Sequence, residues 1–195
     1  DRLLSRGLGD VYKRQGIVLN GGSSSRMGRD KGEILYKGRR LIDIAIETLL
    51  AAEVEDVVIV GGEKKIHSLE ANIQYCEDLF PNEGPLGGVI TGLRNIKSDI
   101  AVILACDYLE IDSSVVLECF SKLKARSMVF PLYQGKEQYL FSAIRTECVE
   151  ALELQFLKGV RSIQKAITCL DCVTYESAYP KKLRSANTPS QLNDD

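Results

Sequence analysis

The chain has 195 residues, 45% of them hydrophobic, and a formal net charge of −2 at pH 7. This length suits one generous domain, and the composition is typical of globular proteins. No stretch approaches the roughly 20 apolar residues of a membrane helix, and the first residues lack the apolar core of a secretory signal. The charge leaves no basic surface for nucleic acid. We therefore expect a cytoplasmic protein that binds neither membranes nor nucleic acid.

The six cysteines mostly lie inside apolar runs, where a reduced cysteine behaves as a small hydrophobic residue. Cys169 and Cys172 form the one close pair, and neither a second pair nor a nearby histidine accompanies them to complete a zinc site. Core cysteines and a reducing compartment are therefore expected.

Residues 1–15 differ from the rest of the chain because they show neither helical nor strand periodicity. They combine scattered basic residues with glycine and serine, and the end of this stretch resembles translated adapter sequence. We therefore treat 1–15 as a leader foreign to the fold and expect 16–195 to form a single domain.

The first part of the chain alternates short apolar runs with amphipathic segments. Buried strands are expected at 16–20, 56–60, 72–76 and 100–105. Helices are expected at 41–52, from Pro85 to about residue 96, and after a cap at Asp112. This alternation predicts a mostly parallel sheet that is covered on both sides.

The order of elements changes after residue 126. Strands are expected at 128–132, 139–144 and 172–175. Between the last two lie two helices, the first with 149, 152 and 156 facing inward and the second with 160, 163, 167 and 170. No internal repeat or low-complexity linker interrupts the pattern. The expected fold class is α/β, a three-layer, Rossmann-like, mostly parallel sheet with helices on both faces.

A loop rich in glycine and serine, 20–31, directly follows the first expected strand. It therefore lies at the carboxyl edge of the sheet, where open α/β folds bind ligands. Its glycines let backbone amides turn toward an anion, and Arg26 and Lys31 supply positive charge. The loop lacks the Gly-Lys-Ser/Thr ending of a Walker A motif and does not match the dinucleotide fingerprint. We interpret it as a phosphate-binding loop, with a flexible surface turn as the alternative.

Asp107 follows the very apolar run at 100–105, which places it at the same edge. A carboxylate there can bind a hard cation such as Mg²⁺, and the alternative is a solvated aspartate that caps a turn. Gly84 and Pro85 begin a helix, and the glycines beside them permit close approach of a flat base. His67, the only histidine, has no acid or nucleophile partner by spacing, which disfavours a hydrolase triad.

Several of these segments together resemble one known family. The loop segments Leu19-Asn20-Gly21-Gly22, Ser24-Ser25-Arg26-Met27-Gly28 and Asp30-Lys31 are similar to the signature of the MobA-type molybdenum cofactor guanylyltransferases, within the nucleotidyltransferase superfamily. Further matches follow in the same order: Glu77-Asp78 with Gly84-Pro85-Leu86-Gly87-Gly88, then Ala105-Cys106-Asp107, and finally Asn187-Thr188-Pro189. The resemblance covers nearly the whole chain, from about 16 to 192.

The resemblance implies a Mg²⁺-dependent enzyme of the nucleotidyltransferase fold. Such an enzyme transfers GMP from GTP to the phosphate of molybdopterin or of the molybdenum cofactor and releases pyrophosphate. Its expected partners include proteins that supply and receive the cofactor. The nucleotide-binding half would span about 16–110, and the acceptor-binding half about 111–195.

The resemblance also implies the residues of the site. The catalytic residues are Arg26, Lys31 and Asp107, with Asp107 as the metal ligand. The nucleotide-binding residues are Leu19, Asn20, Gly21, Gly22, Ser23, Lys31, Asp78, Gly84, Pro85, Leu86, Gly87 and Asp107, and Asn187 is assigned to the acceptor side.

The sequence departs from the family pattern chiefly near the acceptor. Asn20 stands where relatives usually have alanine, Glu137-Gln138-Tyr139-Leu140-Phe141 replaces a basic or histidine-proline element, and Ser185 replaces an asparagine. The alternatives are therefore cytidylyl transfer to molybdopterin, or nucleotidyl transfer to a sugar or alcohol phosphate. A nucleotide-binding protein that does not catalyse is another alternative, and retention of Arg26, Lys31 and Asp107 together argues against it.

Overall fold

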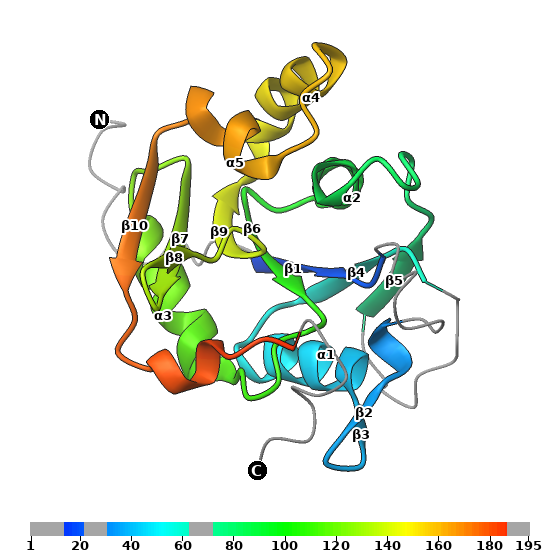
Figure 1. The fold of residues 1–195 in the computed structure, drawn as a ribbon, viewed down its shortest axis with the longest axis vertical. Coiled ribbons are helices and arrows are strands. Elements are labelled where there is room, and N and C mark those ends of the chain that lie inside the picture. The colour runs from blue at the N-terminus through cyan, green and yellow to red at the C-terminus, as the bar shows by residue number, and fades with distance from the viewer. Residues whose placement is uncertain (1–13, 22–30, 63–71, 187–195) are drawn as a thin grey trace, which may run out of the picture.

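The computed structural model describes residues 14–21, 31–62 and 72–186. A sheet runs through the middle of the molecule, with α2, α4 and α5 over one face and α1 and α3 over the other (Figure 1). Among the described residues the sheet has eight strands, seven of them in the order β10-β7-β9-β6-β1-β4-β5. The expected three-layer α/β architecture is confirmed.

The first half of the sheet is entirely parallel, since β1 pairs with β4 and β6, and β4 pairs with β5. These strands are β1 (Arg14–Leu19), β4 (Asp56–Val60), β5 (Asn72–Cys76) and β6 (Ile100–Ala105). All four carboxyl ends therefore meet at one edge of the sheet.

In the second half of the sheet, one of the seven strands in this order runs against both of its neighbours. That strand, β9 (Phe141–Arg145), pairs antiparallel with both β6 and β7 (Met128–Tyr133). Beyond it, β10 (Cys172–Glu176) pairs parallel with β7, and the short β8 (Lys136–Glu137) forms a hairpin with β7. The sheet is thus mostly parallel, as the sequence predicts.

Among the described residues the helices are α1 (Leu41–Ala51), α2 (Pro85–Arg94), α3 (Ser113–Leu123), α4 (Val149–Leu157) and α5 (Ile163–Ala166). The first three begin where the sequence signals predict, whereas α5 begins three residues after the expected position 160. Asp112 caps α3, because its side chain accepts a hydrogen bond from the main-chain N–H of Ser114. Within the described ranges, no helix combines the length and hydrophobicity that a membrane span requires.

Shorter elements connect these pieces. A two-stranded hairpin, β2 (Leu35–Tyr36) and β3 (Arg39–Arg40), precedes α1, and 3-10 turns occur at Lys31–Glu33, Thr146–Cys148, Ile167–Cys169 and Pro180–Leu183. The expected helix around 160–170 is therefore split into α5 and a 3-10 turn. Ile163 and Ile167 are buried as expected, whereas 160 and 170 are only half-buried.

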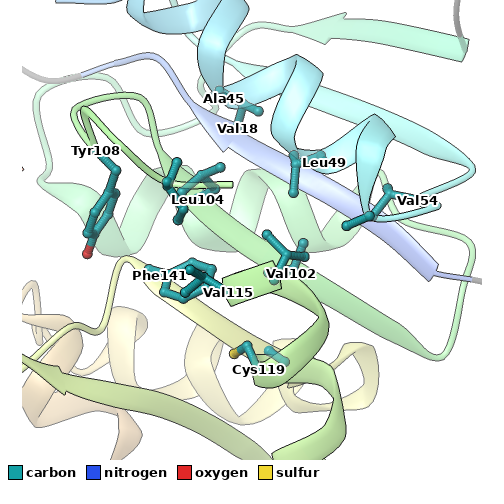
Figure 2. Packing of buried hydrophobic residues seen from close by; sticks show 14 of the residues in the cluster. Val18, Ala45, Leu49, Val54, Val102, Leu104, Tyr108, Val115, Cys119 and Phe141 are labelled. Carbon is teal, nitrogen blue, oxygen red and sulfur yellow. The ribbon is translucent and has the colours of Figure 1, made fainter. Parts of the chain in front are cut away.

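Alternate residues of the central strands enter two separate cores. Val18, Val102 and Leu104 pack under α1 and α3, together with Ala45, Leu49, Val115 and Phe141 (Figure 2). Their strand neighbours Ile17, Leu19, Ala101 and Ile103 point to the opposite core, under α2 and α4. Because successive side chains of a strand point to opposite faces, a strand buried on both faces must be apolar throughout.

The expected start of the fold at Gly16 is wrong by two residues, because β1 begins at Arg14. Gln15 is buried, and its amide nitrogen donates to the Asp56 carboxylate over 2.7 Å. Its amide oxygen accepts the main-chain N–H of Ser98 at 2.9 Å. Arg14 and Gln15, which we assigned to the leader, therefore belong to the sheet.

The cysteines are all free thiols. Cys106, Cys119 and Cys148 are buried as expected, and burial raises the pKa of Cys119 to about 12. Cys169 is exposed, so the expectation of a core residue is wrong there, since the short 3-10 turn after α5 leaves it on the surface. Among the described residues, these thiols do not join other histidine, cysteine or carboxylate side chains in a cluster of three or more that could hold a metal ion.

Candidate functional site

A cavity of about 750 Å³ opens at the carboxyl edge of the parallel strands. Its walls come from the ends of β1, β4 and β6, the loop after β5 and the start of α2. The lining residues are Leu19, Gly21, Lys31, Val60, Gly61, Gly62, Glu77, Asp78, Pro81, Asn82, Gly84, Pro85, Gly88, Ala105, Cys106, Asp107 and Leu140. The cavity therefore lies where the sequence places the ligand site.

The backbones that follow β1 and β4 approach each other closely at this edge. A Cβ atom on Gly61 would lie 3.1 Å from the Cα of Gly21, and Gly61 has a φ of +76°, which L side chains rarely adopt. Gly61 and Gly62 line the cavity, although we did not predict them as site residues. A pair of glycines directly after an apolar strand is the signal that was available for them.

Lys31 and Asp107 form an ion pair at the β1–β6 side of the cavity. The Lys31 Nζ lies 2.6 Å from the Asp107 Oδ2, and the two side chains are 27% and 14% exposed. Lys31 begins the 3-10 turn before β2, and Asp107 follows β6, so the pair joins residues that are 76 positions apart. The two predicted residues are thus brought together, and a limited exposure strengthens their electrostatic interaction.

The C-terminal part of the described chain supports Asp107 from behind. The main-chain N–H of Ala186 donates to the Asp107 carbonyl at 2.9 Å, and that of Leu109 donates to the Arg184 carbonyl at 3.0 Å. Tyr108 and Ser185 form an isolated antiparallel bridge between the same two segments. We call residues 184–186 the C-terminal strap, because it fixes the main chain on both sides of Tyr108.

Tyr108 anchors this loop through its side chain. It is buried, its hydroxyl donates to the Gln138 side-chain oxygen at 3.2 Å, and its ring packs against Phe141 with 5.9 Å between centroids. Burial raises the pKa of Tyr108, and the neighbouring charge of Asp107 raises it further. The hydroxyl therefore stays neutral at physiological pH and acts as a structural donor.

The opposite side of the cavity is acidic. Glu77 and Asp78 follow β5 and line the cavity together with Gly84 and Gly88. Gly84 has φ 88° and ψ 177°, a conformation open only to glycine, and Pro85 occupies the first turn of α2. The start of α2 is therefore shaped by residues without bulky side chains, which leaves room for a ligand.

Three of the predicted nucleotide-binding residues do not line the cavity. Leu86 is fully buried in the core under α2, and Gly87 packs against Phe80, whose Cβ would lie 2.7 Å from a Cβ at Gly87. Asn20 is buried, and its Oδ1 points at Gly32, where a Cβ would lie 2.0 Å away. Gly22, Ser23, Arg26 and Asn187 lie outside the described residues, as does His67.

The oxygen donors on the Lys31 side of the cavity suit a hard cation that is held mainly by the phosphates of a bound nucleotide. Asp107 offers carboxylate oxygens at the cavity wall, and in the part of the chain that the structure describes no cluster of three acidic, histidine or cysteine side chains could hold a metal. Mg²⁺ is commonly bound by one or two carboxylates together with phosphates and waters. The residues present therefore fit Mg²⁺ bound with a phosphate ligand, and they do not form an all-protein cage.

The fold and the cavity together define an α/β protein that opens its ligand site at the carboxyl edge of a mostly parallel sheet. Residues 16–172 match the family model described as "MobA-like NTP transferase domain". Because this match covers most of the chain, the protein belongs to the MobA-like NTP transferase family. The resemblance noted in the sequence is confirmed.

Individual relatives cover nearly the full chain. A molybdenum cofactor guanylyltransferase from Pseudomonas entomophila is 31% identical over 188 residues, which is 90% of this chain and 94% of the relative. A molybdenum cofactor guanylyltransferase from Vibrio atlanticus is 29% identical over 182 residues, covering 90% of this chain and 92% of the relative. The crystal structure of molybdopterin-guanine dinucleotide biosynthesis protein A from Archaeoglobus fulgidus shares the fold, with a TM-score of 0.71, 23% identity and coverage of 91% of this chain and 94% of that chain.

Proposed function

We propose that this protein is a Mg²⁺-dependent molybdenum cofactor guanylyltransferase of the cytoplasm. It transfers GMP from GTP to the terminal phosphate of molybdopterin or of its metal-loaded form. An oxygen of the acceptor phosphate forms a bond to the α-phosphorus of GTP, the bond from that phosphorus to the bridging oxygen breaks, and pyrophosphate leaves. The observation that carries the proposal is the distribution of charge along one cavity, and the activity named for the relatives supports it.

The two sides of the cavity differ in charge, which orients the nucleotide. Asp107 follows β6, while Glu77 and Asp78 follow β5, and β1 and β4 lie between them in the sheet. Three strand spacings separate these positions, about 14 Å at the usual distance between neighbouring strands. The acidic side repels phosphates, so the triphosphate lies near Lys31, and the base lies near Asp78.

Lys31 and Asp107 have complementary tasks at the triphosphate. The ammonium of Lys31 binds phosphate oxygens as a point charge. Asp107 would hold Mg²⁺, which when bound supplies positive charge to the phosphate oxygens as the leaving group departs. Arg26 belongs to the same loop as Lys31 and would add a forked donor to the phosphates.

The chain needs no nucleophile of its own for this reaction. The second ionisation of a phosphate monoester lies near pH 6, so the acceptor phosphate is already largely anionic at pH 7. The protein contributes alignment and charge stabilisation, the two effects that dominate phosphoryl transfer. Gly22 and Ser23 of the loop would cradle the phosphates, and Asn187, which follows the C-terminal strap in the sequence, would contact the acceptor.

The test is an assay of pyrophosphate release. The purified protein is incubated with Mg²⁺, molybdopterin and each of the four nucleoside triphosphates, and the dinucleotide product is identified by its mass. We expect release with GTP and formation of the guanine dinucleotide. Release with CTP but not GTP would contradict the guanylyl assignment, and GTP binding without release from any triphosphate would favour a binding protein. A parallel reaction with a sugar phosphate in place of molybdopterin tests the acceptor.

A further inference from the structure

Thr91 is a polar residue in the middle of α2, and its side chain is fully buried. Its hydroxyl oxygen lies 3.1 Å from the main-chain nitrogen of Leu79 and 3.2 Å from the Oδ1 of Asp78. The same oxygen lies 2.9 Å from the Gly87 carbonyl, one helical turn back. Thr91 therefore joins the helix to the loop that carries Asp78, without lining the cavity itself.

A threonine hydroxyl has one hydrogen to donate, so only one of the two nearby oxygens receives it fully. Donation to Gly87 alone would leave a lone pair of Thr91 facing the negatively charged Asp78 Oδ1, which is unfavourable. Donation to Asp78 removes this repulsion and forms a charge-assisted hydrogen bond. The Gly87 carbonyl keeps its helical hydrogen bond from the main chain four residues on. The charge of the carboxylate therefore favours donation to Asp78, although the Gly87 carbonyl lies closer, at 2.9 Å against 3.2 Å.

The two oxygens of Asp78 have different surroundings. Oδ1 also accepts the main-chain N–H of Phe80 at 2.9 Å, so it has two donors within the loop and helix. Over the residues that the structure describes, Oδ2 takes no hydrogen bond, and a Cβ on Gly88 would lie 3.9 Å from it. Since Gly88 and Asp78 both line the cavity, Oδ2 is the oxygen available to a ligand.

The loop that carries Asp78 is also held against α2 and α4 by apolar packing of Phe80. The centroid of the Phe80 ring lies 4.5 Å from that of the Phe156 ring, and the Cβ of Phe80 occupies the space left by the missing side chain of Gly87. The main-chain N–H groups of Leu79 and Phe80 are both satisfied, one by Thr91 and one by Asp78. Loss of the Thr91 hydroxyl would therefore remove one of the two donors that hold Oδ1 of Asp78, while the packing of Phe80 keeps the loop in place.

We propose that Thr91 is a positioning residue for nucleotide recognition. By holding Oδ1, it directs Oδ2 of Asp78 into the cavity as the acceptor for N–H groups of the base or a ribose hydroxyl. A carboxylate held in its binding orientation avoids the ordering cost that a freely rotating one has on binding. The proposal rests on the proposed function for the identity of the nucleotide, and on the hydrogen bonds of Thr91 for the mechanism.

The first experiment is a double-mutant cycle on GTP affinity, measured by calorimetry with Mg²⁺ and without acceptor. Thr91→Val keeps the shape and removes the hydroxyl, Thr91→Ser keeps the hydroxyl, and Asp78→Asn removes the charge. We expect Thr91→Val and Asp78→Asn each to weaken GTP binding about tenfold. Thr91→Ser should bind GTP like the wild type. The double variant Thr91→Val/Asp78→Asn should bind GTP as tightly as the single variant with the lower affinity. Additive losses would overturn the proposal, because Thr91 would then not act through Asp78.

The second measurement separates positioning from a general loss of stability. Affinities for inosine triphosphate, which lacks the 2-amino group, and for 2′-deoxy-GTP are compared with that for GTP. Thr91→Val should reduce the preference for GTP over at least one of these analogues, whereas a merely loosened structure would weaken all three equally. An unchanged pattern of preference would overturn the proposal. If another triphosphate binds more tightly than GTP, the proposed function fails, and the cycle is run with that triphosphate, so that Thr91 is tested independently.

Discussion

The two ends of the cavity are built in different ways. At one end, Lys31 and Asp107 meet as opposite charges from separate elements beside neighbouring strands. At the other, Asp78 lies on a loop that is held against α2 by Thr91. The first end depends on side-chain charge, and the second on the orientation of one carboxylate. Substitutions at the first should therefore reduce turnover, and substitutions at the second should reduce affinity and selectivity.

The largest effect is expected at Asp107. Asp107→Ala should lower turnover about 10²-fold or more. The reason is that the variant lacks the carboxylate that would hold Mg²⁺, the cation that neutralises the triphosphate. The matched control is Asp171→Ala, which removes an aspartate that pairs with Arg126 on the surface, where both side chains are about half exposed. Steady-state kinetics with a thermal melt of each variant measures the effect. Equal turnover in the two variants would remove Asp107 from the site.

Lys31→Gln should change metal binding at the same end of the cavity. The Lys31 ammonium lies 2.6 Å from the Asp107 Oδ2, so it competes with any other cation for that oxygen. We expect the variant to bind Mn²⁺ about tenfold more tightly than the wild type in the absence of nucleotide, while GTP binding weakens. Electron paramagnetic resonance of free Mn²⁺ gives the metal affinity directly.

Lys37→Gln is the control for Lys31, because Lys37 pairs with Glu110 at 3.6 Å and is 61% exposed. It should leave Mn²⁺ binding unchanged. If Lys31→Gln also leaves the Mn²⁺ affinity unchanged, then Lys31 and the metal do not compete for Asp107.

The sequence predicted the charged end better than the recognition end, for reasons of geometry. Asp107 and Lys31 follow apolar strands that are buried on both faces, and such strands are easily found and have carboxyl ends at one edge. Gly61 and Gly62 directly follow β4 and line the same cavity, although they were not predicted from the sequence. The position of a residue directly after a buried parallel strand therefore predicts a place at this edge of the sheet, even where the residue lies in a loop.

The recognition end depends on rotation around a helix, which a motif does not give. Gly84, Pro85 and Gly88 face the cavity, whereas Leu86 and Gly87, their neighbours in the same motif, pack inward. Thr91 was missed because α2 was interpreted by its apolar face alone. Its signal is a hydroxyl in a run that is otherwise apolar or glycine, and a buried hydroxyl requires partners.

The remaining differences in the fold are non-local. The direction of β9 depends on its pairing with β6 and β7, which no local pattern specifies. The hairpin strands β2, β3 and β8 have two residues each, too short for any periodicity. The first strand was predicted to start late because Gln15 resembles the polar residues before it, whereas its side chain is buried and forms hydrogen bonds with Asp56 of β4 and with Ser98 in the turn before β6.

Gly84→Ala tests the recognition end with a moderate effect. The positive φ of Gly84 excludes a relaxed alanine, so the free energy of unfolding should fall by about 1–3 kcal/mol and the start of α2 should move. We expect weaker GTP binding with little change in kcat at saturating GTP. Gly159→Ala is the matched control, because Gly159 has a similar φ of +87° with open space around it and lies outside the cavity lining. A fall in kcat with unchanged affinity would break the distinction between the two ends.

The smallest effect is expected at Asp112, which supports the charged end from a distance. Asp112 caps α3 and pairs with Lys182, in the turn before the C-terminal strap. Burial raises the pKa of this carboxyl, but hydrogen bonds from Lys182 and Ser114 outweigh burial and lower it below its ordinary value of 3.8. A lowered pKa in the folded state means that the stabilisation is present above pH 3.8 and is lost as the pH falls below it.

Asp112→Ala should therefore lower the free energy of unfolding by about 1 kcal/mol at pH 7, or Tm by about 2–4 °C, and by progressively less in acid. Thermal melts of both proteins between pH 7 and pH 3 measure this difference, and a gap that stays constant across the range would mean that the cap acts without its charge.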